Sequence, residues 1–344
     1  METQTRETIT IHAQATAPPG PVMPADTELP ATGRRPTRRR RFTKHSPAGE
    51  VVLAYLDAQA SRLSALDPAV RRDKPDAVHQ MRVAIRRLRS SLQSFTAIVP
   101  EPDTRNLRAE LKWLGGVLGA ARDTEVLADH LRAGLAAVPQ ELVIGPAQAR
   151  ISVHFAAQEA ETRHAVIEAL DSGRYRMLRA ELSRLLDSPA ATPAADEPAG
   201  KVLPRVVSRT YQRTRRRMRL ARHTPAGHER DVALHETRKA AKRTRYAAEA
   251  VAPALGKTTG RKARRFAKRM TRVQSVLGDH QDAVIARTAA REIGIRAHLA
   301  GENAFSFGLL QERAHHQALA SEDQAYHAWR RASSRKSTSW LPKP

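Results

Sequence analysis

Apolar residues recur along most of the chain at the three- and four-residue spacing of amphipathic helices, and no alternating strand pattern competes with it. Pro, Gly and polar segments interrupt the pattern, which predicts helices at 47–66, 76–98, 104–119, 123–138, 146–171, 174–187, 201–222, 230–252, 258–277, 280–298 and 302–332. We expect Asp103 to cap the helix after Pro102, and Gly173 and Gly227 to mark helix ends. The predicted fold class is all-α.

One predicted helix occurs twice. The run HQMRVAIRRLR that begins at His79 matches the run HETRKAAKRTR that begins at His235. Each copy is followed by Leu-Gly and then an aspartate, Asp123 or Asp282. This internal duplication predicts two homologous helical bundles. The predicted organisation is a disordered basic arm at 1–45, a first half at 46–187, a linker at 188–200, a second half at 201–332 and a tail at 333–344.

The duplicated helix carries a stripe of cations beside a stripe of apolar residues. In the first copy His79, Arg82, Arg86 and Arg89 fall within an arc of roughly 80° and extend over about 15 Å. The apolar positions, about 100° away, are suited to the core and are Val78, Met81, Ile85, Leu88, Leu92 and Phe95. The helix therefore has one face for packing and a neighbouring face for anions.

The second copy keeps the cationic stripe as His235, Arg238, Lys242 and Arg245. Like charges at this spacing destabilise a helix by a few tenths of a kcal/mol per pair, so two such stripes indicate an anion that offsets the repulsion. The alternative is a solvated helix face, which usually alternates Lys with Glu. We expect Asp123 and Asp282 to be helix N-caps and charge partners of the stripe arginines.

Charge extends the pattern beyond the two stripes. The chain has 59 Lys and Arg against 35 Asp and Glu, a net charge of +24, and 24 of these basic residues against 6 acidic ones lie between positions 201 and 290. Such an excess usually has a polyanionic partner, which could be nucleic acid, an anionic membrane or a phosphate polymer. Further candidate contacts at helical spacing are Arg105, Arg108, Lys112, Arg209, Arg213, Arg216, Lys262, Arg265, Arg269 and Arg272.

The amino-acid composition limits the kind of core, the chemistry and the location that the protein can have. Aromatic residues make up 4% of the chain, so the core must consist mainly of small aliphatic side chains. The chain has no cysteine, which excludes disulfides, thiolate zinc sites and cysteine nucleophiles. With no secretory signal or apolar membrane span in the sequence, we expect a soluble, cytoplasmic protein. The arginines at 34–41 are either a solubilising tail or an auxiliary contact to the polyanion.

The two motifs, in this order and present twice, resemble the CHAD family, the conserved histidine α-helical domain. The resemblance covers about residues 47–332 and implies two bundles related by a pseudo-twofold axis, a basic central cleft, and binding of inorganic polyphosphate. It implies these contacts: His79, Arg82, Arg86, Arg89, Lys112, His235, Arg238, Lys242 and Arg245. The position matching Lys112 is Thr271, where Lys268 or Arg272 would have to substitute. No triphosphatase barrel strand is present, because Glu159-Ala160-Glu161-Thr162-Arg163 lies in a helical segment.

Two other function classes remain open. A nucleic-acid-binding protein would use the same charge, but few aromatic residues interleave with the basic stripes to stack on bases. A metal-dependent phosphohydrolase would need clustered carboxylates or histidines, whereas His280 and Asp282 point to different sides of a helix. We therefore expect a binding protein, not an enzyme, that needs no cofactor or metal and acts on polyphosphate or its granules. We also expect both stripes to face one cleft.

Overall fold

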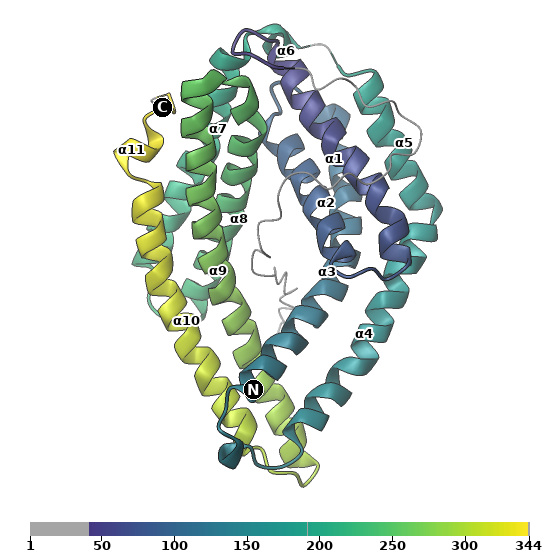
Figure 1. The fold of residues 1–344 in the computed structure, drawn as a ribbon, viewed down its shortest axis with the longest axis vertical. Helices are drawn as coiled ribbons and strands as arrows, with labels where there is room; N and C mark the ends of the chain where they lie inside the picture. Colours follow the sequence, from purple (N-terminus) through teal and green to yellow (C-terminus); the bar gives the residue numbers. More distant parts are fainter. Residues whose placement is uncertain (1–40, 191, 343–344) are drawn as a thin grey trace, which may run out of the picture.

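The protein is built from helices throughout the part of the chain that a computed structural model describes, residues 41–190 and 192–342 (Figure 1). The first half contains α1 (Ala48–Arg71), α2 (Ala77–Ser94), α3 (Glu101–Ala136), the short η1 (Gln140–Leu142), α4 (Ala147–Asp171) and α5 (Gly173–Asp187). The second contains α6 (Pro193–Asp196), α7 (Ala199–His223), α8 (His228–Val251), η2 (Ala252–Ala254), α9 (Gly256–Leu299), α10 (Phe305–Ala332) and α11 (Arg335–Thr338). The all-α prediction is confirmed.

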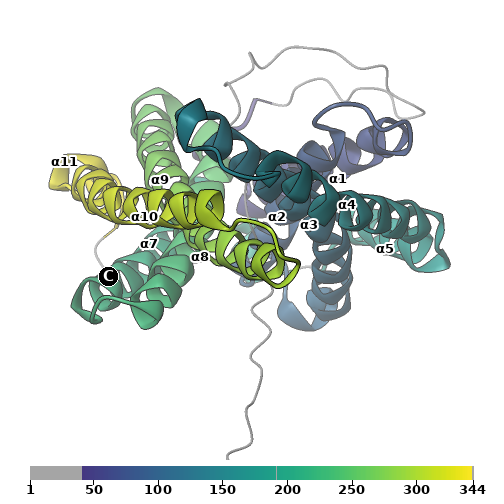
Figure 2. The ribbon, with the colours of Figure 1, turned by 90° about the horizontal axis from the view of Figure 1, so that it is seen from below.

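The two halves stand side by side and are joined at both ends (Figure 1). At one end the segments before α1 and α7 pair, with Ala48 N donating to Glu197 O at 2.9 Å and Ala199 N donating to Ser46 O at 2.8 Å. At the other end α3 and α4 pack with α9 and α10 around a small core that includes Ile151, Phe155 and Phe307. Figure 2 shows this end from below. In the middle, α2 lies against α8.

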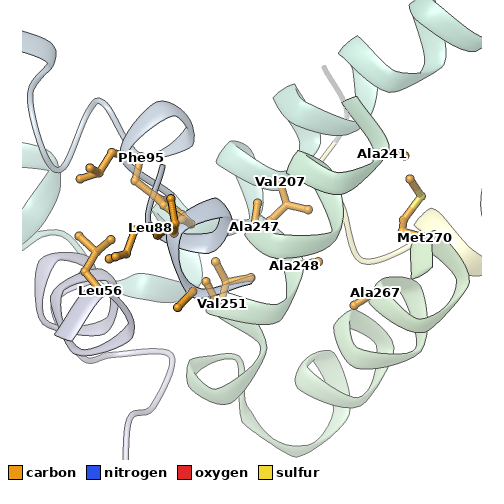
Figure 3. Close-up of a cluster of buried hydrophobic side chains, with 14 of the residues drawn as sticks. Leu56, Leu88, Phe95, Val207, Ala241, Ala247, Ala248, Val251, Ala267 and Met270 are labelled. Carbon is orange, nitrogen blue, oxygen red and sulfur yellow. The ribbon is translucent and has the colours of Figure 1, made fainter. Parts of the chain in front are cut away.

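The main core runs through both halves. The apolar stripe of α2 is buried as its spacing predicts, with Met81, Leu88 and Leu92 each 0% exposed. The same cluster continues into α7, α8 and α9, where small alanines allow the helices to approach closely. Figure 3 shows Leu56, Leu88 and Phe95 of the first half beside side chains of the second. This shared packing fixes α2 and α8 relative to each other.

Two predicted helix breaks are wrong. The segments 104–119 and 123–138 form the single helix α3, and 258–277 and 280–298 form the single helix α9. Gly119 and Gly278 lie inside these helices, at a cost of about 1 kcal/mol each relative to alanine. Asp123 and Asp282 therefore are not N-caps.

Smaller corrections concern the ends of elements. Asp103 lies in the first turn of α3, whose N-cap is Pro100, and the predicted linker contains α6 and the first residues of α7. The predicted tail includes α11. Trp340, also in this tail, packs against Phe266, and the centroids of the two rings are 5.8 Å apart. Of the predicted basic arm, residues 1–40 lie outside the described part of the chain. Gly173 and Gly227 were predicted to mark helix ends, and they lie at the starts of α5 and α8, whereas α4 and α7 have Ser172 and Thr224 as C-caps.

Candidate functional site

A pocket of about 140 Å³ lies between α2 and α8, where the two halves meet. Six of its eleven lining residues are Lys or Arg and none is acidic; the lining residues are Arg82, Ile85, Arg86, Arg89, Ser90, Gln93, Gly115, Lys239, Lys242, Arg243 and Tyr246. We call it the basic pocket. It brings three arginines of the first predicted stripe together with Lys242 of the second. Because α2 and α8 share a core, these cations are held without further ordering of the chain.

Arg82 is buried at the inner end of this site and is balanced by a carboxylate. Its side chain is 5% exposed, and its Nη1 donates to Asp123 Oδ1 at 2.9 Å. Gly119 lies against this guanidinium, and a Cβ there would be in ordinary van der Waals contact with Arg82 Nη2, at 3.6 Å. The charge-partner role predicted for Asp123 is confirmed. The Leu-Gly-x-x-x-Asp motif thus places a glycine beside the guanidinium and a counter-charge one helical turn later.

Arg238 is the counterpart of Arg82 on α8, and it is buried even more deeply. The residue is 2% exposed, and a Cβ at Gly278 would lie 3.3 Å from its Nη2. Burial lowers the pKa of Arg238 to about 10, against the opposing charges of Asp282 and Asp123. Arg238 does not line the basic pocket. Its charge acts from behind the lining residues.

Arg86 and Lys242 differ from these two arginines because no carboxylate pairs with them in the described part of the chain. Arg86 has two buried guanidinium atoms, Nε and Nη1, without a hydrogen-bond partner. Burial lowers the pKa of Lys242 well below its usual value, and the charges of Arg238, Arg86 and Arg82 lower it further. The two unpaired cations come from different halves and line the same pocket. Both side chains are half-buried, and a cation held partly out of water without a paired carboxylate is costly, so the lining favours an anion as a ligand.

His79 and His235 begin the two stripes but do not line the pocket. Burial lowers the pKa of each imidazole to about 4, and neighbouring cations add to the effect, Arg86 for His79 and Lys239 for His235. Both rings are therefore neutral near pH 7. The Nδ1 atom of His235 is buried and has no hydrogen-bond partner in the described part of the chain. In this state they can act as neutral donors, but they add no positive charge.

Arg245 is held away from the pocket by partners of its own. Its Nε donates to Glu249 Oε1 at 2.6 Å and its Nη1 to Gln274 at 3.2 Å. Glu249 also accepts from Arg87 of α2 at 3.3 Å, so this group ties the halves together. Lys239 and Arg243 line the pocket instead, and sequence reasoning missed both. Each follows a stripe position by one residue. A prediction that allowed for a wider cationic face on α8 would therefore have included both.

The remaining predicted contacts do not line the pocket. The charges of Arg108 and Arg213 still lower the pKa of the lining residue Arg243, after the larger effect of its burial. Arg108 also pairs with Glu101 at 2.9 Å. The other predicted cations do not line the pocket: Arg105, Lys112, Arg209 and Arg216 on α3 and α7, and Lys262, Arg265, Arg269 and Arg272 on α9. Neither Lys268 nor Arg272 lines the pocket in place of Thr271.

Asp282 is a buried carboxyl behind the pocket. Its Oδ1 has no hydrogen-bond partner, and burial raises its pKa to about 7. Arg238 and Lys242 from α8 oppose this rise, whereas Asp279 of α9 and Asp123 of α3 add to it. The side chain also borders a cavity with Arg122, Asp129 and His130 of α3 and Gln317 of α10. Asp282 therefore changes charge near neutral pH beside the cations of the pocket.

We expect polyanion affinity to rise as the pH falls from 8 to 6. A bound polyanion disfavours the charged form of Asp282 and raises its pKa further, so binding is coupled to proton uptake at this carboxyl. The histidines titrate lower, near pH 4 in the free protein. Calorimetric titrations in buffers of different ionisation enthalpy measure the uptake. The Asp282→Asn variant should lose this step, and an unchanged pH dependence in that variant would contradict the assignment.

The described residues, 41–190 and 192–342, contain no group of three His, Asp or Glu side chains placed to hold a metal ion. Within the same ranges, no helix has both the length and the apolar composition needed to cross a membrane.

Comparison with curated proteins finds two similar proteins of Mycobacterium tuberculosis, MT2285 of strain CDC 1551 and Rv2226 of strain H37Rv. Each is 36% identical over 269 residues, which are 78% of this chain and 50% of the relative. The chain thus spans about half the length of these relatives.

Two solved structures share the fold. PptA from Streptomyces chartreusis matches with a TM-score of 0.69 at 21% identity, over 83% of this chain and all of that one. The CHAD domain from the plant Ricinus communis matches with a TM-score of 0.60 at 25% identity, over 91% of this chain and 99% of that one. The CHAD domain family model matches residues 54–291, which include both copies of the basic helix. The chain therefore belongs to the CHAD domain family.

Proposed function

We propose that the protein binds inorganic polyphosphate in the basic pocket, without chemical conversion of the polymer. The observation that carries this proposal is that Arg86 and Lys242 line one pocket from two halves of the chain and form no ion pair with any residue that the structure describes. An anion between them would supply the charge and the acceptors that the described part of the chain does not provide there. Arg82, Arg89 and Arg243 add planar guanidinium groups, which suit phosphate oxygens.

Several features favour a phosphate polymer as the ligand. A linear polyphosphate carries a negative charge on every unit and needs neither base readout nor stacking. The pocket is lined by a single aromatic residue, Tyr246, and that ring is already approached by Arg87 and Arg245 at 5.7 and 5.5 Å. The lining has no carboxylate to hold a catalytic metal. In the cell, a protein with this activity would associate with polyphosphate granules.

A competition experiment tests the proposal against nucleic-acid binding. Labelled polyphosphate is bound to the protein at about 0.15 M salt, near the physiological value. Unlabelled polyphosphate, RNA or duplex DNA is then added at matched phosphate concentration. We expect polyphosphate to displace the label much better, because the narrow pocket admits a bare chain and excludes a duplex. Equal displacement by RNA or DNA would favour the nucleic-acid alternative. Salt dependence alone does not discriminate, because counterion release accompanies the binding of any polyanion.

A further inference from the structure

The surroundings of the basic pocket differ between its two sides. On the side of α1, the cations are engaged within the protein: Arg87 and Arg245 bind Glu249, and Arg62 donates to Gln80 at 2.7 Å. The helix α1 itself contains three acidic residues and two arginines. The corresponding first helix of the second half, α7, contains eight arginines and one lysine but no acidic residue. Positive charge therefore extends from the pocket in one direction.

A buried contact places one arginine of α7 beside the pocket. Thr214 Oγ1 of α7 and Thr244 Oγ1 of α8 are 2.9 Å apart, and both residues are 0% exposed. This hydrogen bond sets the register of the two helices. Arg213 and Arg243, the residues that precede these threonines, are close enough for Arg213 to affect the pKa of Arg243. Arg243 lines the pocket and donates to Gln93 of α2 at 2.7 Å.

Arg213 belongs to a row of arginines along α7. Arg209, Arg213 and Arg217 are spaced by four residues, so they lie on one face and extend over about 12 Å. Arg217 is near α8 too. Burial acts to raise the pKa of Glu236, but the hydrogen bond from Lys239 and, with a smaller effect, the charge of Arg217 lower it. Lys239 lines the pocket. Arg209 and Arg213 are exposed, and none of the three forms an ion pair within the described part of the chain. We call these three residues the α7 arginine row.

We propose that the α7 arginine row is a second subsite that binds the part of a polyphosphate chain emerging from the basic pocket, so that the protein prefers long chains to short ones. This inference rests on the proposed function of the pocket. A short chain occupies the pocket alone, whereas a long chain reaches the row and gains contacts whose effective concentration is set by the chain itself. The long chain gains these contacts only on the α7 side of the pocket, because α1 contains no equivalent row of arginines.

The test compares two triple variants of the full chain. The first is Arg209→Ala, Arg213→Ala and Arg217→Ala. The control is Lys257→Ala, Arg261→Ala and Arg264→Ala, which removes the same charge from exposed positions on α9 that do not line the pocket. Tripolyphosphate and long-chain polyphosphate are titrated against each variant and the unchanged protein over a range of salt concentrations. Circular dichroism verifies that helix content is kept.

We expect the first variant to bind long-chain polyphosphate about tenfold more weakly, while tripolyphosphate binding changes by less than about twofold. Its slope of log affinity against log salt for the long chain should fall by about two, because each single-strand phosphate contact contributes roughly 0.7. The control variant should change neither ligand comparably. Equal weakening by both variants, equal weakening for both ligands, or an unchanged long-chain affinity overturns the subsite. If neither ligand binds the unchanged protein, the proposed function itself fails and the subsite with it.

Discussion

The double variant Arg86→Ala, Lys242→Ala is expected to lose polyphosphate binding and to become more stable at the same time. Each charge-assisted hydrogen bond to a phosphate contributes about 1.5–3 kcal/mol, so removal of both cations should raise the Kd by about a hundredfold or more. The two side chains line one pocket, and neither forms an ion pair with a carboxylate of the described residues. Their removal relieves buried repulsion, and we expect a gain of about 1 kcal/mol or more in the free energy of unfolding.

Isothermal titration with long-chain polyphosphate and urea denaturation measure the two effects. The control is Lys257→Ala with Arg261→Ala, which removes the same charge at exposed positions of α9. A loss of binding in the control as large as in the pocket variant would mean that net charge, not the pocket, determines affinity. A pocket variant that loses stability together with binding would contradict the view that Arg86 and Lys242 await an external anion.

The second large effect is expected at Asp123, whose replacement by alanine should destabilise the protein far more than the same change at Asp282. The two residues occupy matching positions after the repeated Leu-Gly, so each serves as a control for the other. Asp123 pairs with the buried Arg82 at 2.9 Å, and its removal takes a counter-charge away from a buried guanidinium, at a cost of about 3–5 kcal/mol. Asp282 has an unpartnered oxygen and a pKa of about 7, so its ionised form is already disfavoured.

Urea denaturation at pH 7 compares the two variants directly. For Asp282→Ala we expect the free energy of unfolding to fall by no more than about 1 kcal/mol. With a pKa of about 7 in the folded protein, this carboxyl group is only partly ionised at pH 7 and contributes little as a counter-charge. The variant Asp123→Asn should recover part of the loss, because the amide oxygen still accepts from Arg82. A cost at Asp282 equal to that at Asp123 would show that the two halves balance their buried arginines in the same way.

The duplicated helix shows where sequence patterns are reliable. The positions Met81, Ile85, Leu88 and Leu92 are all buried, because helical periodicity decides which side of a helix can leave water. The same periodicity also placed the cations of the stripe beside the core, and three of them do line the pocket. The periodicity could not show which of these cations are buried and which are accessible to a ligand. Arg82 and Arg238 are buried against Gly119 and Gly278 of the facing helices, a contact that no pattern within α2 or α8 indicates.

The helix boundaries show the opposite situation. The sequence predicts helix ends at or beside Gly119 and Gly278, because glycine weakens an isolated helix. In the folded protein each faces an arginine from another helix, and α3 and α9 continue past them. Asp123 consequently lies in the interior of a helix and acts as a counter-ion. The tendency of glycine to weaken a helix is overridden here by a contact between two helices, which the sequence of neither helix shows by itself.

By itself, the sequence determined the helical class, the buried stripe of α2, the excess of positive charge and the resemblance that the family match confirms. These properties follow from periodicity and composition, which are local. Tertiary structure alone decided that Lys239 and Arg243 line the pocket while Arg245 binds Glu249, because the rotation of α8 against α2 and α7 is set by packing between distant segments. It also decided that Arg86 and Lys242 form no ion pair within residues 41–190 and 192–342, since the pairing of a cation depends on what surrounds it in space and not on its neighbours in the chain.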